Sequence, residues 1–204
     1  MKKLITISLF IIASLSLISQ NNSEEYKTIF NKDRISHGGY GGLSLNYSQI
    51  DGGNTIITGV RGGWIIDHKV SIGFAGYGFI NDLHFNNIEN DATSDIAGGY
   101  GGLLIEYIFF PNSPIHISIP LLMGAGAITH ADNWHIDIWD RYSDEADAYF
   151  VIEPGIELEF NLIKFMRMSA GVYYRHTSNI LLSNTDKHAL NGLSTGITLK
   201  FGKF

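Results

Sequence analysis

The sequence predicts an all-β fold, an eight-stranded antiparallel up-and-down transmembrane β-barrel that follows a cleaved signal peptide. The segment Gly-Gly-Tyr-Gly-Gly-Leu occurs twice, at 38–43 and 98–103, and each copy opens a stretch in which apolar and polar residues alternate. Strict alternation gives a strand one apolar and one polar face. The pattern recurs along most of the chain up to the C-terminal Phe204, as expected of a closed membrane barrel.

The beginning of the chain predicts export. Met1, Lys2 and Lys3 form a short basic start, and residues 4–18 are apolar apart from Ser and Thr. This apolar run is shorter than the roughly 20 residues that a spanning helix needs, so 1–19 are expected to be a signal peptide. Residues 20–35 are polar and are expected to form a short periplasmic segment before an outer-membrane barrel at 36–204.

Eight alternating stretches predict the strands in order. They cover roughly 36–50, 54–66, 69–80, 96–110, 114–128, 148–161, 165–179 and 191–204. Each is close to the ~9–11 residues with which a tilted strand crosses a bilayer. No later stretch is long and apolar enough for a helical span, so any membrane span is expected to consist of strands.

The connections between these strands predict the orientation of the barrel. Residues 67–68, 110–113 and 161–164 are tight turns, whereas 81–95, 129–147 and 180–190 are long and polar. Outer-membrane barrels place short turns in the periplasm and long loops outside, and an even strand count returns both termini to the periplasm. The tight link at 51–53 is the exception, because it is a hairpin turn on the long-loop side.

The alternation also divides the side chains between lipid and lumen. Large apolar residues share one parity, and the other parity collects nearly every charge of the strands: Arg61, Glu106, Glu153, Glu157, Glu159, Arg167 and Arg175. Side chains fill an eight-stranded interior, and unpaired buried charges are costly. We therefore expect an ion-paired lumen that is plugged by side chains, with His116 as hydrogen-bonded filling; a narrow solute channel is an alternative. Aromatic residues near strand ends are expected to form interfacial girdles: Tyr47, Trp64, Tyr107, Phe109, Tyr149 and Tyr174.

The repeated segment raises a question about the strand count. Its 60-residue offset spans three predicted strands, so the two copies run in opposite directions. Duplication of a multi-strand unit does not produce that arrangement. Either the repeat reflects local packing needs, or the number of strands between 81 and 96 differs from the prediction.

Several segments carry a resemblance to known proteins. They are the two Gly-Gly-Tyr-Gly-Gly-Leu copies, Pro114–Ala127, Ile152–His176 and the last residues of the chain, with the Glu-Pro-Gly turn, Asn161, Tyr174-Arg175 and the terminal Gly-Lys-Phe as their most specific marks. Together they resemble a family of small, largely uncharacterised bacterial outer-membrane β-barrel proteins. The resemblance implies the fold and the membrane, and it assigns no reaction, no cofactor and no catalytic residue.

The resemblance also implies partners: outer-membrane lipid, lipopolysaccharide and the outer-membrane insertion machinery. In other outer-membrane barrels the terminal Phe belongs to a signal that this machinery reads, and apolar residues of the same parity precede it. Here Ile197, Leu199 and Phe201 lie on the opposite parity from Phe204. The extracellular ligand is not identified by the sequence.

One short stretch suggests an enzymatic alternative. His176-Thr177-Ser178-Asn179 is similar to the His-x-Ser-Asn motif of the barrel-type lipid A 3-O-deacylases, in which a His activates a Ser nucleophile and an acidic residue orients the His. His176 and Ser178 share the lipid-facing parity, and Asp186 is the nearest acidic candidate. The alternative function is therefore an acyl hydrolase, while the main prediction is a non-enzymatic membrane protein that supports membrane structure or binds through surface loops.

Composition argues against several other kinds of function and structure. Without Lys2 and Lys3 the chain has 12 Lys and Arg residues against 20 Asp and Glu residues, a net charge of −8, which disfavours a nucleic-acid partner. There is no cysteine, so neither a lipoprotein anchor nor a disulfide framework is expected. The loop at 129–147 is rich in His, Asp and Glu but has no fixed ligand spacing, and we predict a solvated loop with no bound metal.

Overall fold

A computed structural model describes residues 35–80, 96–130, 146–183 and 185–204. The expected signal peptide, the periplasmic segment up to 34, the predicted loop at 81–95 and residues 131–145 of the predicted loop at 129–147 lie outside the described residues. No helix within the described part of the chain is long and apolar enough to cross a membrane.

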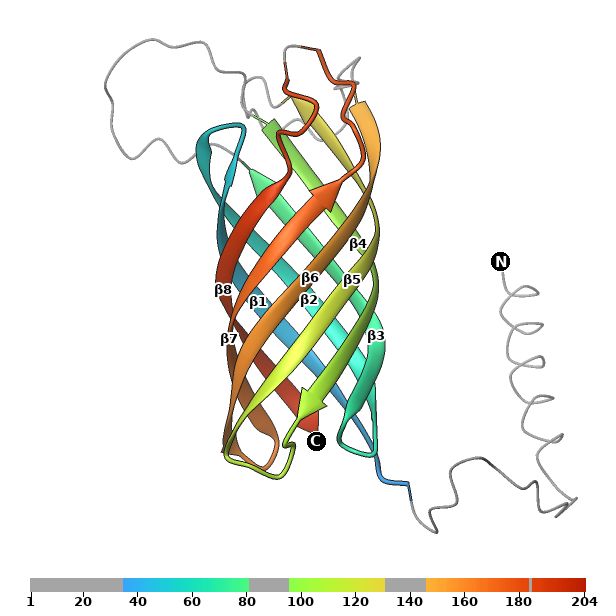
Figure 1. Ribbon diagram of the computed structural model, residues 1–204, viewed down its shortest axis with the longest axis vertical. Helices are drawn as coiled ribbons and strands as arrows, with labels where there is room; N and C mark the ends of the chain where they lie inside the picture. Colours follow the sequence, from blue (N-terminus) through green and yellow to red (C-terminus); the bar gives the residue numbers. More distant parts are fainter. Residues whose placement is uncertain (1–34, 81–95, 131–145, 184) are drawn as a thin grey trace, which may run out of the picture. The chain divides into compact units, whose positions relative to one another are not determined.

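The fold is a closed antiparallel barrel of eight strands (Figure 1), which confirms the predicted fold class. Each strand pairs with its neighbours in the chain, and pairing of the first strand with the last closes the sheet. Residues of the third strand pair directly with those of the fourth, from Val70–Tyr107 to Ile80–Ala97. The repeated segment therefore reflects local packing and no strand was miscounted. The strands are β1 (His37–Ile50), β2 (Gly53–Ile66), β3 (Val70–Ile80), β4 (Ile96–Phe109), β5 (Ile115–His130), β6 (Ala146–Ile163), β7 (Met166–Thr177) and β8 (Gly192–Lys203).

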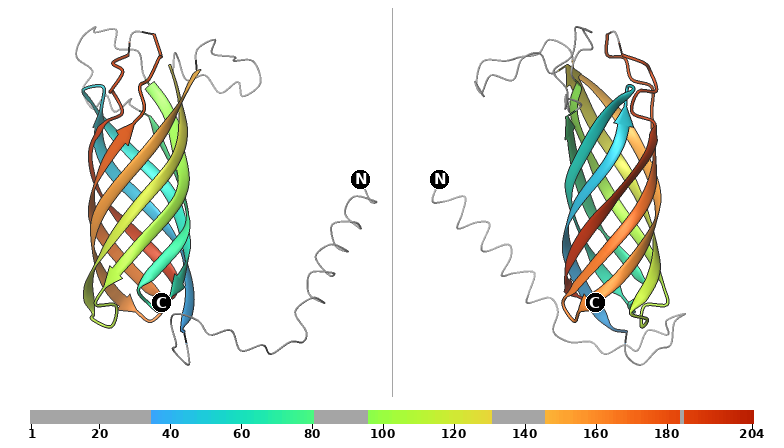
Figure 2. Two further views of the ribbon diagram at one scale, coloured as in Figure 1. Left: turned by 45° about the vertical axis from the view of Figure 1, so that its right-hand side comes forward. Right: turned by 90° about the vertical axis from the view of Figure 1, so that its left-hand side faces the viewer.

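The two ends of the barrel differ in their connections. We call the end with the β2–β3, β4–β5 and β6–β7 turns the short-turn end, and the opposite end the loop end. The C-terminus lies at the short-turn end in both views of Figure 2. β1 also begins there, because Gly39 pairs with Lys203.

The tight β1–β2 link at the loop end is a hairpin turn, as its sequence predicts. Asp51 and Gly52 have φ angles of 49° and 78°. Positive φ at both central residues is the geometry of the hairpin turn whose twist matches that of the flanking strands, and Asp and Gly tolerate it.

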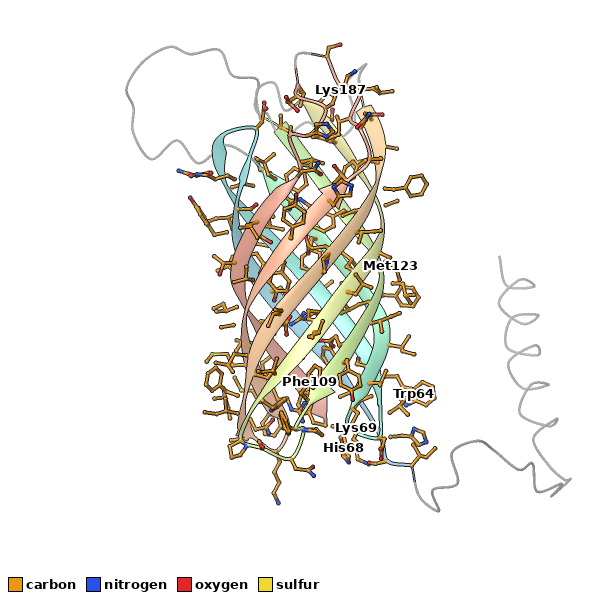
Figure 3. All side chains as sticks on the ribbon, in the orientation of Figure 1. Trp64, His68, Lys69, Phe109, Met123 and Lys187 are labelled. Atoms are coloured by element: carbon orange, nitrogen blue, oxygen red, sulfur yellow. The ribbon has the colours of Figure 1, made fainter. Side chains whose placement is uncertain are left out.

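Alternation along each strand separates two chemical environments. Outward side chains include Leu43, Val60, Phe74 and Ile156, which are 62%, 60%, 71% and 63% exposed. Trp64 and Met123 likewise point away from the wall (Figure 3). The inward positions are mostly buried and carry most of the charged residues of the strands, whereas Lys203 at the end of β8 is exposed. The prediction of an interfacial girdle was wrong for Tyr149. This side chain lies inside the barrel and is 2% exposed, with its hydroxyl 3.3 Å from the carbonyl oxygen of Gly99.

Glycine allows a close approach of two inner wall positions. Gly102 of β4 pairs with Gly124 of β5. A Cβ at Gly102 would lie 2.5 Å from the Cα of Gly124 and would collide with the carbonyl oxygen of Met123. The outward Gly76 has no atom within 4 Å of such a Cβ. Only the first of these sites therefore requires glycine for packing.

Gly102→Ala is expected to lower the free energy of unfolding by about 1–3 kcal/mol, because the wall must shift to admit the methyl group. Gly76→Ala, the same chemical change on an open outer site, is expected to stay within about 0.5 kcal/mol of the wild type. Urea unfolding of both variants in detergent micelles measures the difference. Equal stabilities would contradict the close approach.

Candidate functional site

The lumen gathers most of the charged side chains of the strands. All seven residues that the alternation assigns to it are at most 5% exposed, and the structure adds one that the sequence analysis left out, Lys200 of β8. Its parity, opposite to that of Leu199 and Phe201, was the signal that could have found it. With Lys200 the strand interior holds four carboxylates and four basic groups: Glu106, Glu153, Glu157 and Glu159 against Arg61, Arg167, Arg175 and Lys200.

Lys200 occupies the centre of the ionic cluster. Its Nζ lies 2.7 Å from Glu106 Oε1, 2.7 Å from Glu159 Oε1 and 3.2 Å from Glu157 Oε2. Oxygens of these three carboxylates lie within 4.8 Å of one another, a spacing that could hold a metal ion. In this structure the ammonium group contacts all three, so the chain supplies the cation itself.

Arg61 closes the cluster from the β2 side. Its Nη1 and Nη2 donate to the two oxygens of Glu157 at 2.5 and 2.9 Å, and Nη2 also donates to Ser169 Oγ at 3.2 Å. A bidentate pair of this kind is among the strongest polar contacts in proteins. Tyr173 adds a third hydrogen bond to Glu157 at 2.8 Å, so this fully buried carboxylate is well satisfied.

At the short-turn end the cluster finishes with an aromatic contact. Glu159 Oε2 lies 3.0 Å from His116 Nε2 and 3.6 Å from Arg167 Nη1. The guanidinium carbon of Arg167 lies 4.1 Å from the ring centroid of Phe204, and that ring also stacks on Tyr40. The terminal ring therefore belongs to the lumen, in agreement with its parity.

Two of the predicted network residues stand apart from the cluster. Glu153 accepts a hydrogen bond from the hydroxyl of Tyr100 at 2.8 Å, and Arg175 Nη1 lies 3.5 Å from the same hydroxyl. Within the described residues Arg175 has no ion pair; its other partners are the Leu190 carbonyl oxygen at 2.7 Å and Ser48 Oγ at 3.4 Å. The expected single interleaved network is therefore an ionic cluster plus a separate Glu153–Tyr100–Arg175 group.

The repeated segment has a common role at both of its positions. Its tyrosine points inward in each copy and donates to a buried carboxylate, Tyr40 to Glu106 and Tyr100 to Glu153. The glycines two residues before and after each tyrosine share its inward parity, and a Cβ at any of them would press against a carbonyl oxygen of the adjacent strand. One copy thus supplies a hydroxyl donor to the ionic cluster, and the other supplies one to the Glu153–Tyr100–Arg175 group.

The loop-end part of the lumen holds a large apolar cluster beside the Arg175 group. Side chains from β1 to β6 form one buried cluster there, and residues 180–183 and 185–190, which we call the plug segment, add Ile180, Leu182 and Leu190 to it. Figure 1 shows this segment between β7 and β8 at the loop end. The lumen is consequently ionic toward the short-turn end and apolar toward the loop end.

The residues of the enzymatic alternative lie elsewhere. His176 and Ser178 are exposed on the outer side of the wall, and the Ser178 hydroxyl accepts a hydrogen bond from the Phe150 amide at 3.0 Å. Asp186 is exposed and accepts a hydrogen bond from the His188 amide at 2.6 Å. In the described part of the chain no hydrogen bond joins His176 to either residue, so this structure does not bring the three groups into the order that acyl transfer requires.

Comparison with known proteins supports the fold. None of the protein-family models matches the sequence, and no curated protein is significantly similar to it. The structure is similar to that of Neisserial surface protein A, with a TM-score of 0.58 and 10% identity over 84% of this chain and 100% of that chain. It is also similar to the N-terminal β-barrel domain of Pseudomonas aeruginosa OprF, with a TM-score of 0.51 and 10% identity over 80% of this chain and 96% of that chain.

At this level of identity the likeness shows the fold alone. These neighbours are small outer-membrane barrels, which is the kind of protein that the sequence resembles. Membership of the particular sequence family stays a prediction, because no family model matches.

Lys200→Met is expected to lower the free energy of unfolding by about 3–5 kcal/mol, because it leaves three carboxylates together without their central cation. Lys203→Met, three residues along the same strand, removes an exposed lysine and is expected to cost less than about 0.5 kcal/mol. Urea unfolding in micelles compares the two variants. Equal stability of the two would refute the central role of Lys200.

Proposed function

We propose that the chain is a non-enzymatic integral outer-membrane protein that supports membrane structure or binds through its surface loops, with a lumen closed by its own side chains. The observation that carries this proposal is the reversed polarity of the barrel. Large apolar side chains cover the outside, including Leu43 and Phe74 at 62% and 71% exposed, whereas Lys200 and Arg175 are buried inside. Soluble proteins rarely expose contiguous apolar surface of this extent.

The ends of the apolar surface support a membrane-spanning arrangement. Trp64, Tyr107, Phe110 and Phe165 are exposed toward the short-turn end, and Lys69 is 52% exposed there. Aromatic rings and lysines are enriched where hydrocarbon meets water. We place this end in the periplasm, with both termini, and the long loops outside the cell; the signal peptide at 1–19 and the periplasmic segment at 20–35 belong to the same proposal.

The ionic cluster and the apolar cluster together favour a closed lumen over a channel. A hydrated ion would have to cross the apolar cluster around Leu190, and an apolar solute would have to displace the ion pairs of Lys200. The proposed partners are outer-membrane lipid, lipopolysaccharide and the insertion machinery. For that machinery β8 offers Ile197 and Phe201 on its outer face, at 48% and 42% exposed.

Planar-bilayer recordings test the closed lumen. Purified wild-type protein is expected to insert without a steady open conductance, because side chains occupy both parts of the lumen. A known open porin, reconstituted in the same way, provides the positive control. A stable ohmic conductance that scales with the amount of this protein would contradict the proposal and favour the solute channel.

Cysteine labelling tests the orientation. The chain has no cysteine, so a single introduced thiol reports one position. Lys187→Cys, in the plug segment, is expected to react with an impermeant maleimide on intact cells, whereas Asn112→Cys in the β4–β5 turn is expected to react only after the membrane is opened. The reverse result would invert the proposed orientation.

Met123→Arg tests the lipid contact. Met123 lies on the outer face near the middle of the barrel wall (Figure 3), so a charge there is expected to cost about 2–4 kcal/mol of folding free energy in lipid vesicles. Gln49→Arg, at an exposed site beside the loop-end hairpin, is expected to cost at most about 1 kcal/mol. Urea unfolding in vesicles measures both, and equal costs would argue against a buried bilayer position for Met123.

A further inference from the structure

We propose that the loop-end part of the lumen is a binding chamber for a medium-chain fatty acid. Its carboxylate would bind Arg175, and its tail would replace the apolar side chains that the plug segment inserts. This site goes beyond the proposed membrane function and does not depend on it, since the test below measures binding to the purified protein.

Within the described residues Arg175 contacts no carboxylate, although a carboxylate is the preferred partner of a guanidinium. It is 0% exposed, and within the described chain it contacts only neutral groups: the Leu190 carbonyl oxygen, the Tyr100 hydroxyl and ring, and Ser48 Oγ. A guanidinium carries its charge permanently, and its best match is a carboxylate bound through two parallel hydrogen bonds. The nearby Glu153 is instead held by the Tyr100 hydroxyl at 2.8 Å.

The space beside Arg175 is chemically suited to an aliphatic tail. The buried apolar cluster beside it takes residues from six strands, and Tyr100 joins it to Glu153. Its strand residues are Ile50, Ile57, Ala75, Tyr77, Phe79, Ile96, Tyr100, Leu104, Leu122, Ile128, Tyr149 and Val151. Small inorganic anions would lose their hydration there without compensation. An anion with an apolar tail would satisfy both the guanidinium and the wall.

The plug segment already occupies the chamber as such a ligand would. Leu190 offers its carbonyl oxygen to Arg175 Nε at 2.7 Å while its side chain is fully buried in the apolar cluster. Together with Ile180 and Leu182 it inserts about a dozen side-chain carbons, whose burial is favourable. A twelve-carbon fatty acid would therefore match both the oxygen and the volume that the segment contributes.

The plug segment is not part of the barrel wall, so its displacement would leave the strand pairing intact. It lies between β7 and β8 and contributes no residue to the strand pairing. Its backbone bonds to the barrel include those from Asp51 N to the Ala189 carbonyl at 3.2 Å, from Leu181 N to Asp147 Oδ2 at 2.6 Å and from Arg175 Nε to the Leu190 carbonyl at 2.7 Å. The ligand carboxylate would take over the last of these. A ligand that supplies a charged partner for Arg175 would offset the loss of these contacts.

Carbon-13 NMR of [1-13C]dodecanoate tests this chamber directly. The full barrel is placed in nanodiscs of zwitterionic lipid, and protein-free nanodiscs report the fatty acid that merely partitions into lipid. We expect a separate, saturable carboxylate resonance of one equivalent with the wild type. Absence of any signal beyond that of the protein-free nanodiscs would overturn the proposal.

Two perturbations locate the site. Arg175→Gln is expected to weaken dodecanoate binding by roughly tenfold or more, since a charge-assisted pair is lost, whereas Lys203→Gln, at an exposed lysine, is expected to bind like the wild type. Heat-modified gel mobility checks that both variants are folded.

The second perturbation holds the plug segment in place and does not alter Arg175. Asp51→Cys with Ala189→Cys joins residues whose backbones are already hydrogen-bonded, and no other cysteine interferes. The oxidised protein is expected to lose binding, and reduction of the same sample is expected to restore it. Equal binding by the oxidised and reduced forms, or by Arg175→Gln and the wild type, would refute the chamber.

Discussion

The ammonium group of Lys200 is the contact on which the interior of this barrel depends. Three carboxylates from β4 and β6 meet within 4.8 Å, and their mutual repulsion in a narrow, buried space is tolerable only with a cation among them. That cation arrives on β8, the strand whose pairing with β1 closes the sheet. Closure of the wall and neutralisation of the lumen are therefore coupled. A barrel left open at β8 would lack the one cation that contacts all three carboxylates, although Arg61 of β2 would still pair with Glu157.

The ionic cluster has an apolar counterpart at the other end of the lumen. Tyr100 lies at the boundary, with its hydroxyl between Glu153 and Arg175 and its ring in the apolar cluster. Each part excludes what the other would admit, because charged solutes are opposed by the apolar cluster and apolar solutes by the ion pairs. The same division leaves Arg175 at the floor of an apolar space with neutral partners only, which is an expensive arrangement for structure alone.

Much of the fold followed from the alternation of residue types. The strands and their inward and outward faces agree with the structure within a few residues, since a period of two is a direct consequence of strand geometry. The sequence predicted less of the site than of the fold. Parity assigned Glu153, Glu157 and Arg175 to the lumen, but their heights along it depend on strand tilt and stagger, which close a barrel and leave no local pattern. For that reason the sequence does not predict the separation of Arg175 from the cluster, and the inward parity of Lys200 does not by itself identify its carboxylate partners.

The sequence by itself determined which side of the wall each strand residue faces. Arg61 and Lys200 face inward and Val60 and Leu199 outward because a change of register by one residue would put charges into lipid and isoleucines into the lumen. Only the tertiary structure decided which inward groups meet. Glu106 and Lys200 are 94 residues apart in the chain, and Leu190 reaches Arg175 from a segment outside the strands. Such contacts across a lumen arise from closure of the whole sheet, and no local stretch of sequence encodes that closure.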